Sequence, residues 1–111
     1  MKILFSSTGK NWEDNVDERF GRAKGFVLFD EDTNQIKWLS NDENVNAGHG
    51  AGIQAAQLVL NTGADILITG RIGPKAQEVL RKTNIKIYKA VNISIKQAYK
   101  YLKEGLLKEH E

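Results

Sequence analysis

Two short runs of consecutive apolar residues constrain the fold most strongly. One is ILF at residues 3–5, and the other is ILI at residues 66–68. Unbroken apolar runs of this length are typical of strands buried on both faces, because a strand with one exposed face would alternate with polar residues. We therefore expect strands over residues 2–8 and 64–70 near the centre of a sheet.

The remaining elements follow from shorter patterns. Two β-rich segments, residues 25–29 and 35–39, are separated by four turn-forming residues and predict an antiparallel hairpin. A further short strand is expected over residues 85–88. Apolar residues recur at helical spacing in three segments, which we expect to be helices: residues 51–62, residues 74–84, and a last one from Ser94 to Leu106.

This order of elements predicts a single α/β domain with three layers. The 111 residues suffice for one modest core, and we expect the domain over residues 1–107 with a charged tail at 108–111. Right-handed crossovers give a mixed five-stranded sheet in the order 3-2-1-4-5, with strand 2 antiparallel and three helices around it. That arrangement is ribonuclease H-like.

In this topology the first, third and fourth strands point the same way, so their C-terminal ends share one edge of the sheet and three loops meet there. The loops are residues 7–22, 41–52 and 70–73. They hold the candidate ligand-binding residues, which are Arg19, Phe20, Gly21, Arg22, His49, Gly50, Gly52, Gly70, Arg71 and Gly73.

An anionic ligand suits this set of residues. Two of the loops run into helix N-termini, whose backbone N–H groups and dipole favour negative charge. The arginines add planar, permanently charged donors, and the glycines let a ligand approach the backbone. The alternative for any single glycine is a tight turn without a ligand.

The sequence argues against several kinds of catalytic or metal site. It has no Cys, so thiolate ligands and a catalytic thiol are excluded. His49 is a candidate metal ligand, with a solvent-facing loop residue as the alternative. Asp17 and Glu18 could form an acid/base pair, although acidic loop residues are usually just solvated. The first strand carries no carboxylate, and phosphate-loop and nucleophile-elbow motifs are absent, so we expect no enzyme.

Charge and hydropathy indicate the setting. The net charge of +2 is too small to argue for nucleic acid, and the lysines along the last helix, including Lys96, Lys100 and Lys103, are interpreted as a solvated face. No stretch approaches the about 20 apolar residues that a membrane span needs. We therefore expect a cytoplasmic protein without membrane or nucleic-acid partners.

Four motifs occur together in a family-like order. They are RFGRA at residues 19–23, GAGIQAA at 50–56, GADILITG at 63–70 and IGPKA at 72–76. In this combination the chain resembles the dinitrogenase iron–molybdenum cofactor biosynthesis family over nearly its whole length. The resemblance implies a ribonuclease H-like fold and a small non-catalytic protein, similar to the stand-alone nitrogenase accessory factors.

The resemblance also implies a cargo. It would be the iron–molybdenum cofactor or a related iron–sulfur cluster, held transiently on its way between cofactor-assembly proteins. Many family members that handle the cofactor have His immediately before FGRA, whereas this chain has Arg19, which favours electrostatic binding over direct ligation there. The alternative is a regulatory or scaffold module that binds a phosphate-bearing small molecule or a partner protein at the same edge. An uncovered edge at residues 35–40 could pair two copies of the chain, so we expect a monomer or a weak homodimer.

Overall fold

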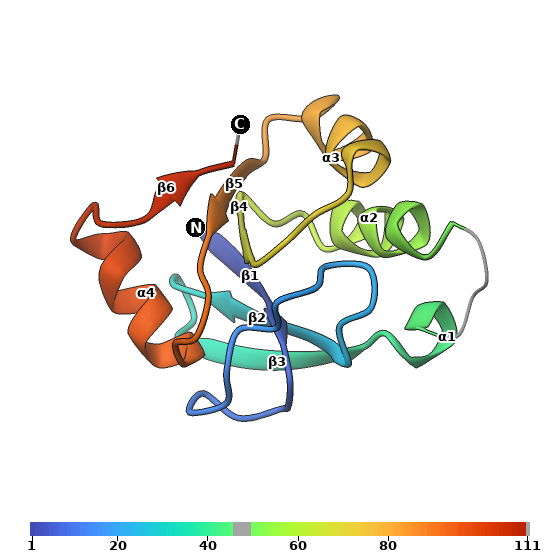
Figure 1. Ribbon diagram of the computed structural model, residues 1–111. Coiled ribbons are helices and arrows are strands. Elements are labelled where there is room, and N and C mark those ends of the chain that lie inside the picture. The colour runs from blue at the N-terminus through green and yellow to red at the C-terminus, as the bar shows by residue number, and fades with distance from the viewer. Residues whose placement is uncertain (46–49, 111) are drawn as a thin grey trace.

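The first apolar run forms the central strand of a mixed sheet (Figure 1). The computed structural model describes residues 1–45 and 50–110. Strand β1 (Lys2–Ser7) pairs antiparallel with β2 (Gly25–Asp30) and parallel with β4 (Ile66–Thr69), which is the second apolar run. All of β4 and all of β1 except Lys2 are buried, as unbroken apolar strands require.

The expected hairpin is present. Strand β3 (Gln35–Ser40) pairs antiparallel with β2, with Phe29 opposite Ile36 and Val27 opposite Trp38. In the turn, the Asp30 carboxylate accepts a hydrogen bond of 2.9 Å from the Asp32 N–H. Asn34 adopts the left-handed conformation, with φ of 58°, which asparagine tolerates better than most residues.

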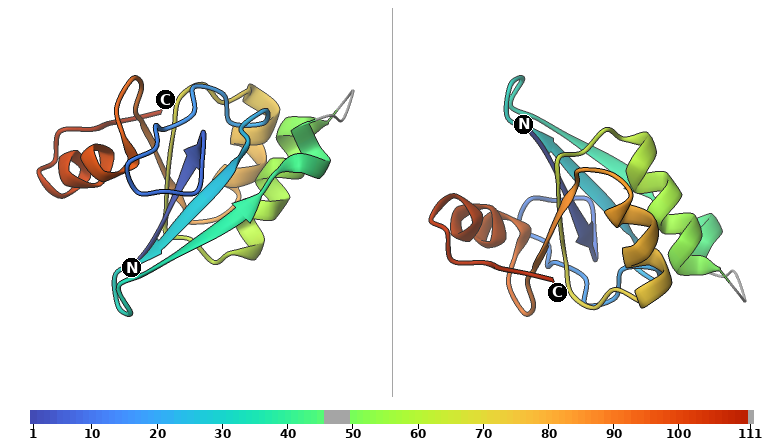
Figure 2. Two further views of the ribbon diagram at one scale, coloured as in Figure 1. Left: turned by 90° about the horizontal axis from the view of Figure 1, so that it is seen from below. Right: turned by 90° about the horizontal axis from the view of Figure 1, so that it is seen from above.

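Three helices enclose the sheet from two sides (Figure 2). Helices α2 (Ala51–Asn61) and α3 (Pro74–Arg81) lie against one face, and α4 (Ile95–Lys103) lies against the other. The core is divided accordingly: Leu4 packs with the α2–α3 side, and Phe5 with the α4 side. Full burial of an aromatic or aliphatic side chain stabilises the fold by about 1.5–3 kcal/mol. The three-layer architecture is therefore held by two cores that share one sheet.

The sheet has six strands where we expected five. The order is β3-β2-β1-β4-β5-β6, so the predicted order holds and β6 (Lys108–Glu109) is added beside β5 (Lys86–Lys89). Gly105, with φ of 73°, ends α4 and lets the chain turn back. Residues 108–109 pair through their backbone, which an apolar pattern does not reveal. The ribonuclease H-like classification stays a prediction.

The described residues also contain a fourth helix, so the expectation of three was wrong. Helix α1 (Asp42–Val45) is a single turn after β3, and the Ser40 hydroxyl accepts a bond of 3.2 Å from the Asp42 N–H. One turn is too short to leave a helical period in the sequence. In residues 1–45 and 50–110, no helix is long and apolar enough to cross a membrane.

Candidate functional site

Three loops meet at the carboxyl ends of β1 and β4 and enclose a shallow depression of about 580 Å³. The residues that line it come from all three loops: Arg19, Phe20, Gly21, Arg22, Gly50, Ala51, Gly52, Arg71, Ile72 and Gly73. Eight of these are residues that the sequence singled out. Of the other two predicted site residues, Gly70 is buried against the backbone of Glu18 and does not line the depression, and His49 lies outside the described residues.

Backbone hydrogen bonds hold the first loop against the third. The Phe20 N–H donates to the Arg71 carbonyl at 2.9 Å, and the Gly70 N–H donates to the Asp17 carbonyl at 3.2 Å. Arg19 and Arg71 form a parallel bridge. The loop therefore runs beside the end of β4 like a short extra strand, and two arginines from distant parts of the sequence become neighbours.

Buried side chains and close backbone contacts anchor this arrangement. Phe20 is only 1% exposed and packs on Phe26 with 5.5 Å between ring centroids, so it fixes the loop and its ring is withdrawn from solvent. A Cβ on Gly21 would lie 2.9 Å from the Gly52 Cα, and one on Gly70 would lie 2.5 Å from the Glu18 Cα. Both glycines are therefore required by close approach, and Gly70 supports the site without lining it.

Two helix N-termini open onto the depression. Gly50 is the N-cap of α2, with φ of 79°, and Gly73 is the N-cap of α3, which starts with Pro74. Neither cap supplies a side-chain hydrogen bond. The N-terminal N–H groups of both helices therefore receive no side-chain acceptor from their caps, and each helix dipole places partial positive charge there.

The charged groups of the site are mostly basic. Arg19, Arg22 and Arg71 are all exposed, and no acidic residue lines the depression among the residues described. Asp17 lies just outside: its Oδ1 accepts a hydrogen bond of 2.9 Å from the Arg19 N–H and is 3.8 Å from the Arg19 Nε. Sequence reasoning missed this supporting role. An Asp whose side chain accepts a hydrogen bond from the backbone N–H two residues later is nevertheless a known turn signal.

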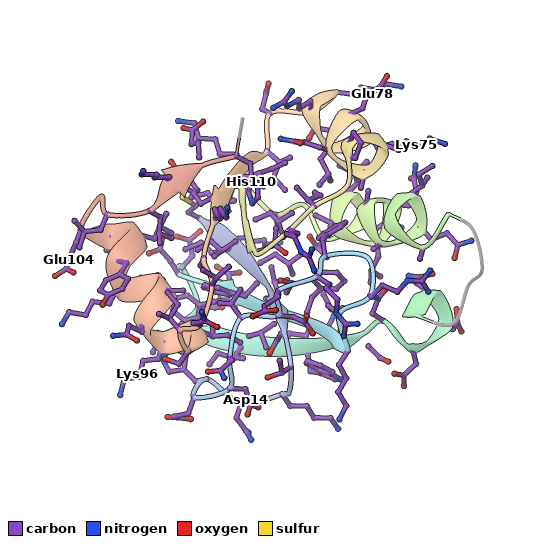
Figure 3. All side chains as sticks on the ribbon, in the orientation of Figure 1. Asp14, Lys75, Glu78, Lys96, Glu104 and His110 are labelled. Carbon is purple, nitrogen blue, oxygen red and sulfur yellow. The ribbon has the colours of Figure 1, made fainter. Side chains whose placement is uncertain are left out.

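The two candidate acid/base residues lie in different surroundings. Asp17 is buried and already bonded to the Arg19 backbone, whereas Glu18 is exposed. Within the described residues, no group of three or more His, Asp or Glu side chains could hold a metal ion. The backbone N–H of His110 (Figure 3) donates to the Ile87 carbonyl at 2.8 Å, and its ring Nε2 lies 3.4 Å from the Thr69 carbonyl oxygen at the end of β4. It supports the sheet edge.

Comparison with known proteins gives the chain its family. Residues 1–105 match the family described as dinitrogenase iron-molybdenum cofactor. The chain belongs to this family. The match covers the depression and all three loops around it. The depression is therefore part of the region that this chain shares with the family.

Several known proteins are similar to this chain in sequence or structure. The chain is 36% identical over 94 residues to the uncharacterized protein MJ0580 of Methanocaldococcus jannaschii, covering 83% of this chain and 80% of that one. The apo form of the orange protein from Desulfovibrio gigas is 34% identical, with a TM-score of 0.93 and coverage of 98% and 92%. A putative NifB protein from Thermotoga is 27% identical, with a TM-score of 0.84 and coverage of 97% and 91%.

These similarities extend along almost the whole chain, so they concern the domain and its loops together. The family description and the neighbouring structures make this a small cofactor-related protein. The predicted family is thereby confirmed.

Proposed function

We propose that this chain is a non-catalytic carrier of an anionic metal–sulfur cluster, of the iron–molybdenum or iron–sulfur type, during assembly of a metal cofactor. One observation supports this above all. Three exposed arginines and two helix N-termini without side-chain caps line a single depression, in a family whose description names the iron-molybdenum cofactor.

The depression suits an anion with charge spread over its periphery. Each helix N-terminus favours a negative group by about 0.3–1 kcal/mol when exposed and up to about 2 kcal/mol when partly buried. Arginines add charge-assisted hydrogen bonds, which are about twice as strong as neutral ones. Because Arg19, Arg22 and Arg71 come from two loops, they can contact different sides of one cluster.

The same features suit release. The chain has no Cys, so the grip is electrostatic and not a set of thiolate bonds. Exposed charges exchange partners readily, because water and salt compete with them. A carrier of this kind would receive its cluster from one cofactor-assembly protein and deliver it to another, in the cytoplasm, as a monomer or weak homodimer.

A second function is favoured by one specific observation. Helix N-termini are common phosphate-binding sites, so the starts of α2 and α3 would also suit a phosphate-bearing small molecule. The protein would then be a regulatory or scaffold module without a metal. The two functions use the same residues but differ in the metal content of the bound ligand.

An anaerobic titration with isolated iron–molybdenum cofactor tests the proposal. In parallel the protein is titrated with a synthetic iron–sulfur cluster, and each mixture is separated by gel filtration and assayed for metal. We expect metal to co-elute with the protein. Arg19→Ala and Arg71→Ala should each weaken binding by about 3- to 30-fold, because each removes one or two charge-assisted hydrogen bonds.

Arg81→Ala is the matched control, because Arg81 is an exposed arginine at the far end of α3. It should bind like the native protein, and all three variants should keep the native melting temperature. If no metal co-elutes with the protein and phosphate-bearing metabolites raise its melting temperature, the second function is favoured over the first. His49 stays a predicted metal ligand. An affinity for the cluster that does not change with pH would contradict this role.

A further inference from the structure

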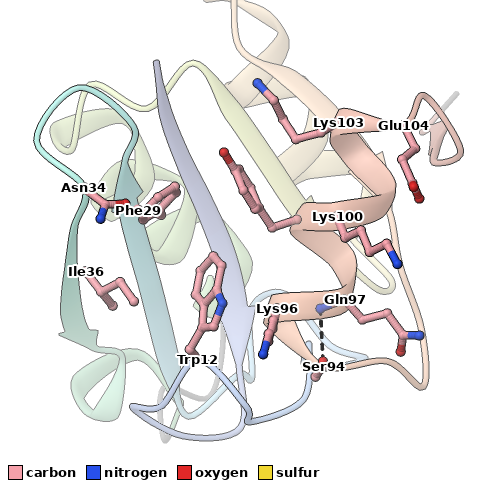
Figure 4. A pocket seen from close by; sticks show the side chains of 11 residues that line it. Trp12, Phe29, Asn34, Ile36, Ser94, Lys96, Gln97, Lys100, Lys103 and Glu104 are labelled. Carbon is pink, nitrogen blue, oxygen red and sulfur yellow. Dashed lines mark hydrogen bonds between the residues drawn. The ribbon is translucent and has the colours of Figure 1, made fainter.

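A second concave surface lies on the other side of the sheet, away from the arginines. It is an open groove of about 780 Å³ between α4 and the β2–β3 hairpin (Figure 4). We name it the aromatic groove, after the side chains that form its floor: Trp12, Phe29 and Tyr99. None of the residues that line it also lines the depression at the loops.

The floor is a packed aromatic cluster. The Trp12 ring centroid is 5.2 Å from that of Phe29 and 5.6 Å from that of Tyr99, and the latter two rings are 5.0 Å apart. Backbone bonds hold Trp12 in place, because its carbonyl accepts from the Lys96 N–H at 3.0 Å. The floor is thus an apolar surface whose rings are already packed together, and such preorganisation lowers the entropy lost when a partner binds.

The groove exists because the two faces of the sheet are covered unequally. Helices α2 and α3 both pack on one face, whereas α4 alone packs on the other (Figure 2). The wall opposite α4 is left without a helix, and Ile36 of β3 stays 46% exposed there. An exposed apolar side chain beside an aromatic floor marks a surface that a partner can cover.

One wall of the groove is basic. Lys96, Lys100 and Lys103 follow one another along α4, whereas Glu104 is the one acidic residue among those that line the groove. Lys96 lies at the start of α4 and Glu104 at its far end (Figure 3). Lys103 is neutralised by Glu31, at 2.9 Å, but in the described part of the chain no ion pair involves Lys96 or Lys100.

We propose that the aromatic groove docks an acidic amphipathic helix of a partner protein. The apolar face of such a helix would cover Trp12, Phe29 and Ile36, and its acidic flank would meet Lys96 and Lys100. In that position the helix would lie beside α4 and give this face the second helix that the opposite face already has.

A second copy of this chain is a poorer occupant. None of its helices of eight residues or more in the described part is acidic: α2 has no charged residue, α3 is mixed, and α4 is basic. Their buried faces are moreover used in the chain's own cores. Charge complementarity therefore selects a different protein, one with glutamates or aspartates beside an apolar stripe.

The test uses a synthetic peptide of about 16 residues, with Leu and Phe at helical spacing and Glu along both flanks. A second peptide carries Lys in place of every Glu, and a third has the acidic peptide's composition in scrambled order. Binding is measured by calorimetry and by tryptophan fluorescence. We expect only the acidic amphipathic peptide to bind the native protein.

Variants locate the peptide on the protein. The double variant Lys96→Glu/Lys100→Glu should bind the acidic peptide at least about tenfold more weakly than the native protein does. It should also gain affinity for the Lys peptide. Ile36→Glu should abolish binding of the acidic peptide. Lys75→Glu/Lys82→Glu, two exposed lysines on and just after α3, is the matched control and should bind like the native protein. All of these residues are exposed, so circular dichroism should show a native fold.

Several outcomes would overturn the proposal. Equal binding of the scrambled peptide, or an unchanged affinity in Lys96→Glu/Lys100→Glu, would mean that the groove does not recognise an acidic helix. Sedimentation of a dimer that Ile36→Glu dissociates would assign the groove to a second copy instead. The groove and the depression share no residue. Variants that lose peptide binding should therefore still bind the cluster, so each proposal can be contradicted without affecting the other.

Discussion

At the scale of single residues, Glu31 joins the hairpin turn to α4. One carboxylate oxygen, Oε2, accepts a hydrogen bond from the Tyr99 hydroxyl and another from Lys103 Nζ, the latter at 2.9 Å. The bond from Tyr99 and then the bond from Lys103 lower the pKa of Glu31. The same carboxylate, together with burial, raises the pKa of Tyr99 to about 12.

These shifts predict how stability changes with pH. The pKa of Glu31 is lower in the folded state, so its contribution is present above the unfolded pKa and is lost as pH falls through the folded pKa. The pKa of Tyr99 is higher in the folded state, so its contribution is complete below about pH 10 and is lost as pH rises through about 12. Urea unfolding at a series of pH values measures the loss of stability at both the acid and the alkaline end.

Tyr99→Phe isolates the alkaline limb. This variant should lose the part of the decline above pH 10 that Tyr99 causes, whereas Tyr101→Phe, on the same helix, should retain it. An alkaline limb that is identical in the native protein and Tyr99→Phe would contradict the assignment. Tyr99 also forms part of the aromatic groove, so the peptide titration should be performed near neutral pH, where both groups keep their folded-state protonation.

At the scale of elements, the site depends on how closely two loops approach each other. Gly70 is buried at the end of β4, and the backbone of residues 17–20 lies directly against it. Gly73 begins the next helix only three residues later, but nothing lies within 4 Å of the position where its Cβ would be, and its φ is −69°. Gly70 is therefore required by close packing, whereas the position of Gly73 has room for a side chain.

The two glycines give a matched pair of substitutions. Gly70→Ala should destabilise the protein by about 1–3 kcal/mol, because the new methyl group would force the backbone of Glu18 to move. Gly73→Ala should change the free energy of unfolding by less than about 0.5 kcal/mol. Denaturant unfolding measures both, and equal stability of the two variants would show that the loops can separate without strain.

At the scale of the whole molecule, β6 closes one side of the sheet. It pairs with β5 next to the chain terminus, and the His110 N–H continues the pairing to Ile87. Without it, the N–H and C=O groups of β5 would form an open edge, and open edges promote association between chains. The terminal residues thus protect an edge that their charged side chains alone do not reveal.

Deletion of residues 108–111 tests this protection. We expect a loss of about 1 kcal/mol in unfolding free energy, because a few partly exposed backbone hydrogen bonds are removed. Sedimentation should also show more self-association than in the native protein. Lys108→Ala is the control, since the pairing uses backbone atoms and the side chain is exposed. Native stability of the truncated chain would mean that β6 contributes nothing.

Much of this architecture could be predicted from sequence because the strongest signals coincide with buried elements. The apolar runs at residues 3–5 and 66–68 became β1 and β4, and turn chemistry identified the hairpin. Elements without an apolar period were missed. Helix α1 is one turn long, and β6 is two charged residues that pair only through their backbone.

The candidate site divides in the same way. Topology was enough to predict that the loops would meet, and eight predicted residues do line one depression. It could not show that Phe20 is buried, that Gly70 is packed against the backbone of Glu18, or that the Asp17 carboxylate accepts a hydrogen bond from the Arg19 N–H. The aromatic groove also escaped prediction, because Trp12, Phe29 and Tyr99 come from distant segments that only the folded chain brings together.

The burial of Phe20 beneath an exposed Arg19 and Arg22 has a consequence for how such proteins can diversify. The Phe20 side chain, which secures the loop, faces inward, and the two arginine side chains, which line the depression, are exposed. Mutation can therefore exchange the outward residues one at a time while the loop keeps its path. A single scaffold of this kind can change the chemistry of its depression over evolution without passing through an unfolded ancestor.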